Sequence, residues 1–590
     1  MHLITSSDER TWKKGRPVIF LDERCRPYNQ KNTWLKMDAI VAKPFGLGNK
    51  KVEENALLKK QLTKDLFPIL YKTLNQFHNT DYNERFWRIV VGHWLAKYIS
   101  VIINRVGAIE QCLSSYSITT TAMFQYDESV LTKNDITSFV QACGDDEWNN
   151  SLYQYIFNNL NNIDFDIEII SGNPRKIRRL NTVSKRKKYK DLIYKAIFNV
   201  LNLFSRKEDG VIINSYIPKI YEAKLCLALG QVPLFRRTQE YHITKEVDYK
   251  YRKNLSNKNS KNMNNSIDYI SRKLLFQLLP VCYLEGFSEM IQEVENLPWP
   301  KTPKFIFTSN SFIFDEIFKL WTATKISNGS TYFIGQHGNN YGTSKYSNPS
   351  IEQHTSDKFI TWGWGDSNQN TIPAFIFTSL GKNNDYDPSG GVLLIQDMMY
   401  GKHRTWDGSS HFVAYLKDLS LFVKGLNMPI KDSLTIRLHS ASRHYDDAEK
   451  RWKDYDKNVS IDPGTKSIDK VIKKNRLTIH GYDSTGILET LSQNIPTLAL
   501  MNFGSYGNNG DGYLIDSAKP YYDLLINAGI IHLNTESLYK KVNGIFYNVE
   551  SWWNQDSIQN ARIAFCDKYA KKSTNPVNDL KYIIESHYNK

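Results

Sequence analysis

The chain has 590 residues and carries 76 Lys and Arg against 61 Asp and Glu, a formal net charge of +15 at neutral pH. Hydrophobic residues make up 41% and aromatic residues 13% of it, enough apolar area for large cores, which excludes disorder as the dominant state. At roughly 100–200 residues per domain, the length predicts two to four domains.

The sequence predicts a soluble, cytoplasmic protein. Asp8 and Glu9 interrupt the N-terminal residues before a secretory pattern forms. The longest nearly uncharged apolar stretch, Leu274 to Leu284, is shorter than the roughly 20 residues that a membrane-spanning helix needs. Six cysteines are scattered without a CxxC pair or metal-ligand spacing, so we expect reduced thiols and no metal site.

The excess positive charge favours partners that carry phosphate: a nucleic acid, a nucleotide, a lipid pyrophosphate or an anionic membrane surface. A codon bias toward Lys, Asn, Ile and Tyr gives the same excess, so charge alone does not choose among them. Residues 175–190 carry nine Lys and Arg. Such a run forms a solvated face or linker, or it docks onto an anionic membrane or a phosphorylated acceptor.

In the first half of the chain, short β-branched and aromatic runs predict strands at residues 2–5 and 17–21. Apolar residues at helical spacing predict helices over 55–78 and 83–106. The second of these is rich in Trp, which favours a core helix over one lying on a membrane surface. The Asn- and Lys-rich residues 249–266 predict an exposed loop.

From residue 304 onward, strands and helices alternate regularly. Apolar runs that begin near 304, 331 and 358 each end in small or polar residues, and a second set starts near 390. This alternation predicts two doubly wound α/β units with parallel sheets, followed by a helical tail. Ligands of such sheets bind outside the carboxyl ends of the strands, so candidate site residues are those just after each strand.

The most informative stretch is residues 476–502, where a strand gives way to a polar turn and then a helix. Ser484, Thr485 and Gly486 lie at the helix N-terminus, where hydroxyl and backbone N–H groups favour an anion such as a nucleotide phosphate. Glu489 follows on the first turns of the helix and is placed to accept from ribose hydroxyls. The pattern fits a structural alternative equally well, with Ser484 or Thr485 as N-cap and Glu489 solvated.

Two further strand ends carry charged residues. Arg437 and His439 alternate on one strand, so they face the same side and suit a nucleotide phosphate. Gln396 and Asp397 end the first strand of the second unit, where the Asp397 carboxylate is a candidate nucleophile or base. The structural alternative for Asp397 is a cap of the loop that follows.

A glycine-rich loop at residues 333–342 places His337 and Gln336 just after a strand. Glycines let the backbone approach a ligand closely, and the imidazole is a candidate general base. The chain has no G-x-G-x-x-G fingerprint with a ribose-binding acid, no Walker lysine and no HExxH, which argues against a nicotinamide, P-loop or zinc-protease site.

Several of these segments resemble a family of transferases from bacterial surface-polysaccharide clusters, the LIC12162 type. The resemblance spans nearly the whole chain and is carried by LITSSDERTW, VIFLDERC, RFWRIVVGHWL, INSYIPKIYEAKLCLALGQVP and GQHGNNYG. The C-terminal unit is similar to the nucleotide-binding half of capsule-type Kdo transferases, in which an HP dipeptide and an S-x-x-G-F-E-A-L segment bind CMP. Here His439-Ser440 replaces the HP dipeptide, and the second segment reads S-T-G-I-L-E-T-L from Ser484.

The resemblance implies an α/β, GT-B-like fold of two Rossmann-type domains facing a cleft, with helical additions and a C-terminal crossing helix. It places an acceptor domain at 1–385, a nucleotide-sugar domain at 386–535 and helices that pack back on the N-terminal domain at 536–590. The donor it implies is a CMP-activated ulosonic acid such as CMP-Kdo, and the acceptor a glycan or polyprenol-linked glycan of an O-antigen or capsule. Because CMP leaves with a single phosphate, no metal or other cofactor is expected.

The roles that follow from the resemblance are specific. Arg437 and His439 hold the phosphate, the Ser484–Gly486 turn adds donors, and Glu489 holds the ribose. For a retaining reaction, the position of Asp397 at the end of a strand makes it the expected nucleophile; an inverting reaction needs a base near the acceptor, for which His337 and Asp8 are candidates. Asp8, Gln336 and Gln396 are expected in the cleft on the acceptor side.

Two alternatives belong to other classes. A teichoic-acid polymerase transferring an alcohol phosphate from a CDP-alcohol also has tandem Rossmann units and a His-Gly loop, but would need a richer basic pocket for two phosphates. A non-catalytic nucleic-acid binder would use the basic residues 175–190 together with aromatic stacking. That run contains one aromatic residue, Tyr189, and no recognised binding module, so no nucleic-acid partner is expected.

Overall fold

The structure is a computed structural model. It describes the chain apart from residues 47–48, 161–162, 175–197, 199, 239–240, 259–264, 347–349, 383–384, 398–411, 441–446, 502–513 and 589–590. The basic run 175–190, predicted as a docking surface, lies outside the described residues.

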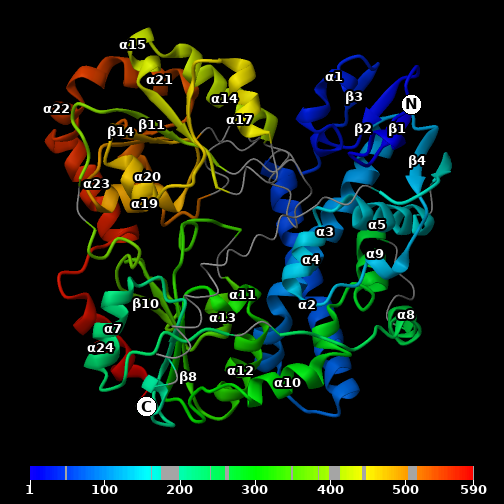
Figure 1. Ribbon diagram of the computed structural model, residues 1–590, viewed down its shortest axis with the longest axis horizontal. Helices are drawn as coiled ribbons and strands as arrows, with labels where there is room; N and C mark the ends of the chain where they lie inside the picture. The colour runs from blue at the N-terminus through cyan, green and yellow to red at the C-terminus, as the bar shows by residue number, and fades with distance from the viewer. Residues whose placement is uncertain are drawn as a thin grey trace.

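Three parallel sheets organise the described residues (Figure 1). The N-terminal sheet has the order β3-β2-β1-β4-β5, with β1 (His2–Ile4), β2 (Val18–Phe20), β3 (Ala39–Val41), β4 (Thr120–Phe124) and β5 (Asp166–Ile170). The middle sheet has the order β10-β9-β8-β7-β6, with β6 (Val211–Ile213), β7 (Phe305–Thr308), β8 (Thr331–Gly335), β9 (Lys358–Thr361) and β10 (Thr371–Pro373). The C-terminal sheet has the order β13-β12-β11-β14-β15-β16, with β11 (Gly391–Ile395), β12 (Leu434–Arg437), β13 (Ser460–Asp462), β14 (Asn475–His480), β15 (Thr497–Leu500) and β16 (Ile531–His532).

Helices connect the strands in all three units. The N-terminal unit contains α1 (Lys31–Trp34), α2 (Asn49–His78), α3 (Glu84–Ser115), α4 (Ile136–Ala142) and α5 (Asp146–Asn159). The middle unit contains α7 (Lys219–Ala228), α8 (Tyr249–Lys258), α9 (Ser266–Leu274), α10 (Phe287–Glu295), α11 (Ser311–Phe314), α12 (Glu316–Ser327) and α13 (Ile351–Thr355). The C-terminal unit and tail contain α14 (Phe412–Gly425), α15 (Met428–Asp432), α17 (Ala448–Tyr455), α18 (Ile468–Ile472), α19 (Thr485–Ser492), α20 (Lys519–Asn527), α21 (Thr535–Ile545), α22 (Val549–Trp553), α23 (Asp556–Tyr569) and α24 (Pro576–Tyr588).

The middle and C-terminal sheets form the GT-B-like pair of Rossmann-type units that the sequence predicts. The span predicted as one domain, 1–385, nevertheless carries two sheets rather than one. Strands β3 and β5 lie at the edges of the first sheet, and β3 has only three residues, so neither leaves a strong apolar run in the sequence. The N-terminal sheet is therefore a third unit that the sequence pattern did not separate.

Each unit contacts the other two. Arg85 of α3 donates to the carbonyl of Thr355 (2.9 Å) in the middle unit. Tyr28 before α1 donates to Asp454 of α17 (2.9 Å) in the C-terminal unit. The C-terminal helices return to the middle unit, where the N–H of Lys571 donates to the carbonyl of Trp362 (2.9 Å) and α24 packs on α7.

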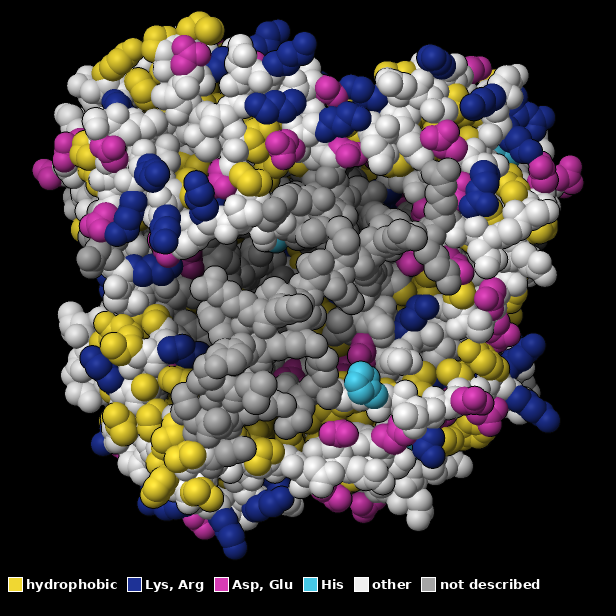
Figure 2. Space-filling model, in the orientation of Figure 1, with side chains coloured by type: hydrophobic (Ala, Val, Ile, Leu, Met, Phe, Trp, Pro, Cys, Tyr) yellow, Lys and Arg dark blue, Asp and Glu magenta, His cyan; other side chains and the backbone are white. Residues whose placement is uncertain are grey.

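Positive charge is spread over the visible surface. In Figure 2, Lys and Arg side chains lie around the periphery of all three units, interspersed with Asp and Glu. Among the described residues on this face, no single basic stripe stands out. This distribution gives no support to a backbone-tracking nucleic-acid surface.

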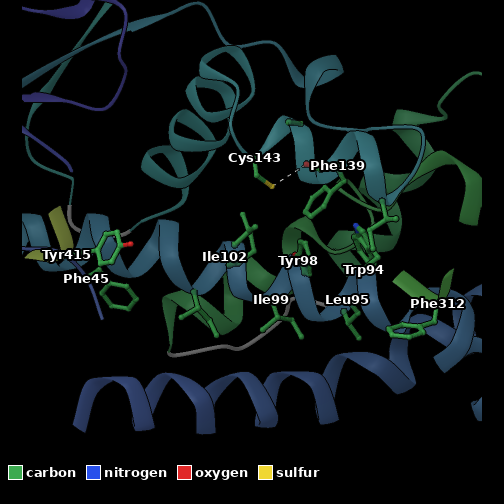
Figure 3. Close-up of a cluster of buried hydrophobic side chains, with 14 of the residues drawn as sticks. Phe45, Trp94, Leu95, Tyr98, Ile99, Ile102, Phe139, Cys143, Phe312 and Tyr415 are labelled. Atoms are coloured by element: carbon green, nitrogen blue, oxygen red, sulfur yellow. Dashed lines mark hydrogen bonds between the residues drawn. The ribbon is translucent and has the colours of Figure 1, made fainter. Parts of the chain in front are cut away.

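Helix α3 is the central core helix. Trp94, Tyr98 and Ile102 project from it into a buried cluster that also takes in Phe139 and Phe312 (Figure 3). In the described chain, α3 is the one helix long and apolar enough to cross a membrane, with a mean hydropathy of 1.3, but 83% of that window is buried within the protein. Protein side chains therefore cover it here, in agreement with the predicted core helix.

Residues 249–258, predicted as exposed loop, form helix α8 instead. Its anchor is the buried Arg252, whose guanidinium donates to both carboxylate oxygens of Glu285 (2.7 and 2.5 Å) and to the carbonyls of Phe276 and Leu279 (both 2.6 Å). A buried ion pair within an Asn- and Lys-rich segment has no periodic signature, so the composition misleads.

Replacing Arg252 should test how much this anchor stabilises the fold. Arg252→Ala leaves the Glu285 carboxylate and two carbonyls without their partner, and we expect the free energy of unfolding to fall by about 3–5 kcal/mol. Urea denaturation followed by circular dichroism measures it. Lys540→Ala, which removes an exposed ion pair with Glu536, should leave the unfolding curve nearly unchanged. Equal effects of the two substitutions would contradict the assignment.

Candidate active site

Two loops from different sheets meet through Asn339. The loop after β8 carries Asn339, and the turn after β14 carries Asp483 and Thr485. The Asn339 side-chain amide donates to Asp483 Oδ1 (2.5 Å), and its backbone N–H donates to Thr485 Oγ1 (3.1 Å). A Cβ at the neighbouring Gly338 would lie 3.1 Å from Thr485 Oγ1, so a glycine permits this approach. The structure thereby brings together the two most prominent sequence motifs.

His337 is oriented by a hydrogen-bonded relay. Its Nδ1 lies 3.1 Å from the hydroxyl of Tyr341, which donates to Oε1 of Glu352 in α13 (2.9 Å). Burial raises the pKa of Glu352, but electrostatic coupling to His93 and His337, together with the hydrogen bonds that Glu352 accepts, outweighs burial and lowers that pKa overall. Glu352 is therefore an ionised acceptor for the Tyr341 proton.

The relay fixes the tautomer of His337. Tyr341 has one hydroxyl proton, which goes to Glu352, so its oxygen accepts from Nδ1–H of His337. The lone pair then lies on Nε2. Burial lowers the pKa of His337, an effect that the negative charge of Glu352 opposes. At neutral pH the imidazole is a neutral, oriented base, the state that general-base chemistry requires.

Aromatic rings surround this base. The ring of His337 lies 6.1 Å from that of Tyr216, 5.7 Å from Phe312 and 5.3 Å from Tyr341, measured between centroids. His93 packs on the far side of Phe312, and burial lowers its pKa to about 4, so it is uncharged at neutral pH. Tyr216, Tyr341 and Glu352 are not among the site residues predicted from the sequence; the four-residue spacing from His337 to Tyr341 is the signal that the sequence offers for them.

Ser484 directs its hydroxyl into the protein. Thr490 donates to the carbonyl of Gly486 (3.0 Å), so its oxygen accepts from Nε2–H of His480 (3.2 Å). Nδ1 of His480 is then the acceptor for the Ser484 hydroxyl (3.1 Å). Burial lowers the pKa of His480 to about 3, which keeps the ring neutral. The Ser484 hydroxyl, predicted to donate to a ligand phosphate, therefore donates to His480 instead.

The N-terminus of α19 keeps the features of an anion site. Ser484 is the N-cap residue but makes no side-chain cap bond to the helix. Thr485 Oγ1 accepts the backbone N–H of Asn339 (3.1 Å), a hydrogen bond that does not use the hydroxyl's own proton. A Cβ at Gly486 would lie 2.8 Å from Cε1 of His480, so the helix start requires glycine for close packing. Glu489 is half-buried one turn further along.

The strand ends of the C-terminal sheet differ in how open they are. Arg437 donates to Asp462 of β13 (2.5 Å) and to the carbonyl of Lys466 (2.7 Å), so two of its donors are engaged. His439 is exposed two residues later. Asp397 is half-buried, and its backbone N–H donates to the Tyr415 hydroxyl of α14 (2.8 Å).

The three residues expected on the acceptor side have internal contacts. Gln336 donates to the carbonyl of Gly338 (2.8 Å) and accepts from the backbone of Trp362 and the indole of Trp364, so its buried amide holds the His337 loop. The Gln396 oxygen accepts from the indole of Trp452 (2.6 Å).

Asp8, predicted on the acceptor side of the cleft, lies in the loop after β1 of the N-terminal unit, where it caps a short 3-10 helix. Its fully buried carboxylate is bound by Arg10 through two hydrogen bonds of 3.0 and 2.6 Å. Asp22 and Arg24 repeat this arrangement after β2, at 2.9 and 2.6 Å. The repeated D-E-R sequence thus has a structural use in both places.

The family model described as LIC12162 family transferase matches residues 1–584. The chain belongs to the LIC12162 family of transferases. No curated protein matches it. In the described part of the transferase, no group of three or more His, Cys, Asp or Glu side chains could hold a metal ion.

Solved structures offer only loose matches. The wall teichoic acid polymerase TagF, soaked with CDPG, is 10% identical over 68% of this chain and 97% of its own, with a TM-score of 0.33. The spinosyn rhamnosyltransferase SpnG, complexed with spinosyn aglycone, is 11% identical over 64% of this chain and 100% of its own, with a TM-score of 0.31. At such low TM-scores these structures do not help to assign the fold, which we assign from the strands and helices of the transferase itself.

The relay can be tested by removing the charge of Glu352. Glu352→Gln keeps an oxygen for Tyr341 but removes the negative charge that raises the pKa of His337, so we expect that pKa to fall further. Histidine NMR resonances followed against pH report it. His2, whose pKa is not influenced by Glu352, is the internal control. An unchanged or higher pKa of His337 would contradict the relay.

The buried contact between Asn339 and Asp483 predicts a free energy of unfolding that depends on pH. Burial raises the pKa of Asp483 to about 7, against roughly 3.9 in an unfolded chain. The folded state therefore binds this proton more tightly, and its contribution to stability is present below pH 4 and lost as pH rises toward 7. Asp483→Asn should remove that component, visible as a flatter stability-against-pH curve in urea denaturation. Parallel curves for the two proteins would refute the assignment.

Proposed function

We propose that this transferase is a glycosyltransferase that moves a CMP-activated ulosonic acid, with CMP-Kdo as the donor. The observation that carries the proposal is the contact of Asn339 with Asp483 and Thr485. It joins the loop that carries the neutral, oriented imidazole of His337 to the helix N-terminus at the end of β14. A base and an anion site that face each other across two parallel sheets suit transfer from a nucleotide sugar.

In this proposal the two sides of the cleft divide the work. Nε2 of His337 takes the proton of the acceptor hydroxyl as it attacks the anomeric carbon, and the bond to the CMP phosphate breaks. The N-terminus of α19, the Thr485 hydroxyl, Arg437 and His439 stabilise the departing phosphate, and Glu489 accepts from the ribose. A base-assisted attack inverts the anomeric carbon; a retaining reaction would use Asp397 as nucleophile instead.

A single phosphate needs less charge compensation than a pyrophosphate, which is why we propose a metal-independent reaction. The acceptor is a glycan or polyprenol-linked glycan of the cell-surface polysaccharide. Such an acceptor places the enzyme in the cytoplasm, at the inner face of the membrane. The basic residues 175–190 would supply the membrane contact, although they lie outside the described residues.

One observation favours a second candidate. The His337-Gly338 pair in a loop after a strand also suits a base for transfer of an alcohol phosphate from a CDP-alcohol. That donor carries two phosphates, which would need additional cations near α19. The donor-side Arg437 already has two donors engaged by Asp462 and Lys466, which favours the single phosphate of CMP.

Nucleotide selectivity tests the donor. In calorimetric titrations with CMP, CDP, UMP and GMP, we expect selective CMP binding that EDTA does not alter. His439→Ala and Thr485→Val should each weaken CMP binding, because each removes a group that contacts the phosphate. Preference for CDP would favour the alcohol-phosphate alternative. Binding of none of the four nucleotides would refute the nucleotide site.

Measuring kcat and CMP affinity in the same variants distinguishes the catalytic base from the nucleotide-binding residues. His337→Ala should reduce kcat with CMP-Kdo by about 10²–10⁴-fold, since a general base contributes that much, while CMP affinity stays near wild type. Product formation from CMP-Kdo, followed by CMP release, measures it. Asp397→Asn is the matched variant: if it abolishes kcat and His337→Ala does not, the reaction uses the aspartate and the inverting assignment fails.

A further inference from the structure

Resting on the proposed function, we propose that Tyr216 is the platform on which the sugar ring of the acceptor lies beside His337. Tyr216 follows β6, so it reaches the same edge of the middle sheet as His337 after β8. Their rings are inclined by 28° with centroids 6.1 Å apart. A ring that lies against Tyr216 therefore borders on the imidazole.

The backbone of Tyr216 marks it as more than a turn residue. Its φ is +59°, in the left-handed region that bulky L-residues rarely adopt. Asn214, two residues earlier, also has a positive φ, of +46°, but Asn tolerates this region. If only the shape of the turn mattered, Gly or Asn at position 216 would adopt this φ with less backbone strain. Strain of this kind in a bulky residue points to a use for the side chain.

The surrounding loop is built to hold this conformation. Asn214 donates to the Ser311 hydroxyl (2.7 Å), and Ser309 donates to the carbonyl of Ser215 (2.8 Å). The Ser215 hydroxyl in turn donates to the buried Glu222 (2.5 Å). These contacts join the ends of β6 and β7 to α7. The strain at Tyr216 is therefore imposed by the middle sheet and not by the tyrosine side chain.

The side chain of Tyr216 is available for a ligand, whereas the other rings at His337 are not. It is 41% exposed, while Phe312 is 3% exposed. The Tyr341 hydroxyl already donates a hydrogen bond to Glu352. The hydroxyl of Tyr216 accepts from the Asn310 amide (3.0 Å), a hydrogen bond that does not use the hydroxyl's own proton.

These features match the chemistry of a sugar. A pyranose presents a face of C–H groups, which packs on the negative face of an aromatic ring, and hydroxyls at its rim, which accept hydrogen bonds. Tyr216 offers both a ring and a free proton donor. A sugar on this ring would bring its hydroxyls toward His337, where the proposed reaction needs one.

The test uses the full chain and methyl glycosides of Kdo, galactose and glucose as acceptor probes, followed by saturation-transfer NMR with CMP present. We expect at least one probe to bind wild type, and Tyr216→Asn to weaken that binding at least tenfold. Tyr216→Phe, which keeps the ring, should lose less than fivefold. Tyr547→Asn, at a tyrosine that is 70% exposed elsewhere, should bind as wild type does.

Two further measurements separate this role from a structural one. Because Asn adopts a positive φ more readily, Tyr216→Asn should melt at or above the wild-type temperature, whereas a purely structural tyrosine would lower it. CMP affinity should be unchanged in Tyr216→Asn. Equal probe binding by wild type and Tyr216→Asn, no probe binding by wild type, or a lowered melting temperature would overturn the platform. Probe binding that depends on Tyr216 in a chain that binds no CMP would refute the proposed donor and leave the platform standing.

Discussion

A contact of Asn339 joins the loops at the carboxyl ends of the middle and C-terminal sheets. Its side chain and backbone donate to Asp483 and Thr485, so it links the middle unit to the turn before α19. Burial of this contact raises the pKa of Asp483 to about 7, so a proton or the Asn339 amide must compensate its oxygens. The relation between base and nucleotide site in the proposed mechanism depends on this bridge.

Hydrogen-bond direction then distributes the chemistry. In the middle unit, the Tyr341 hydroxyl donates a hydrogen bond to Glu352 and accepts one from Nδ1–H of His337. The lone pair of the His337 ring therefore lies on Nε2. In the C-terminal unit, the Ser484 hydroxyl donates a hydrogen bond to His480. Of the two hydroxyls at the start of α19, that of Thr485 is then the one placed to donate to a ligand. Both imidazoles are kept neutral by burial. Burial therefore keeps each ring uncharged, and its hydrogen bonds fix one tautomer.

Regular strand–helix alternation made the middle and C-terminal sheets predictable, and strand ends correctly located the loops at His337 and Ser484. The N-terminal sheet stayed hidden because its edge strands β3 and β5 are short or exposed. Helix α8 was misread because Arg252 is stabilised by Glu285, a partner 33 residues away. Residue type suggested that Ser484 and Gln336 face a ligand, but their protons have internal acceptors, and Glu352 reaches His337 only through Tyr341. Such pairings depend on tertiary contacts that no local pattern encodes.

The central claim is that a nucleotide bound at the N-terminus of α19 lies beside the loop that carries His337, because Asn339 joins the two. Hydrogen–deuterium exchange with and without CMP tests it most directly, because it reports each loop separately. The account predicts slower exchange on CMP addition in peptides covering both 335–342 and 480–490, with the N-terminal sheet at 1–30 unchanged. Protection confined to residues 1–30, or absent from both cleft loops, would contradict it.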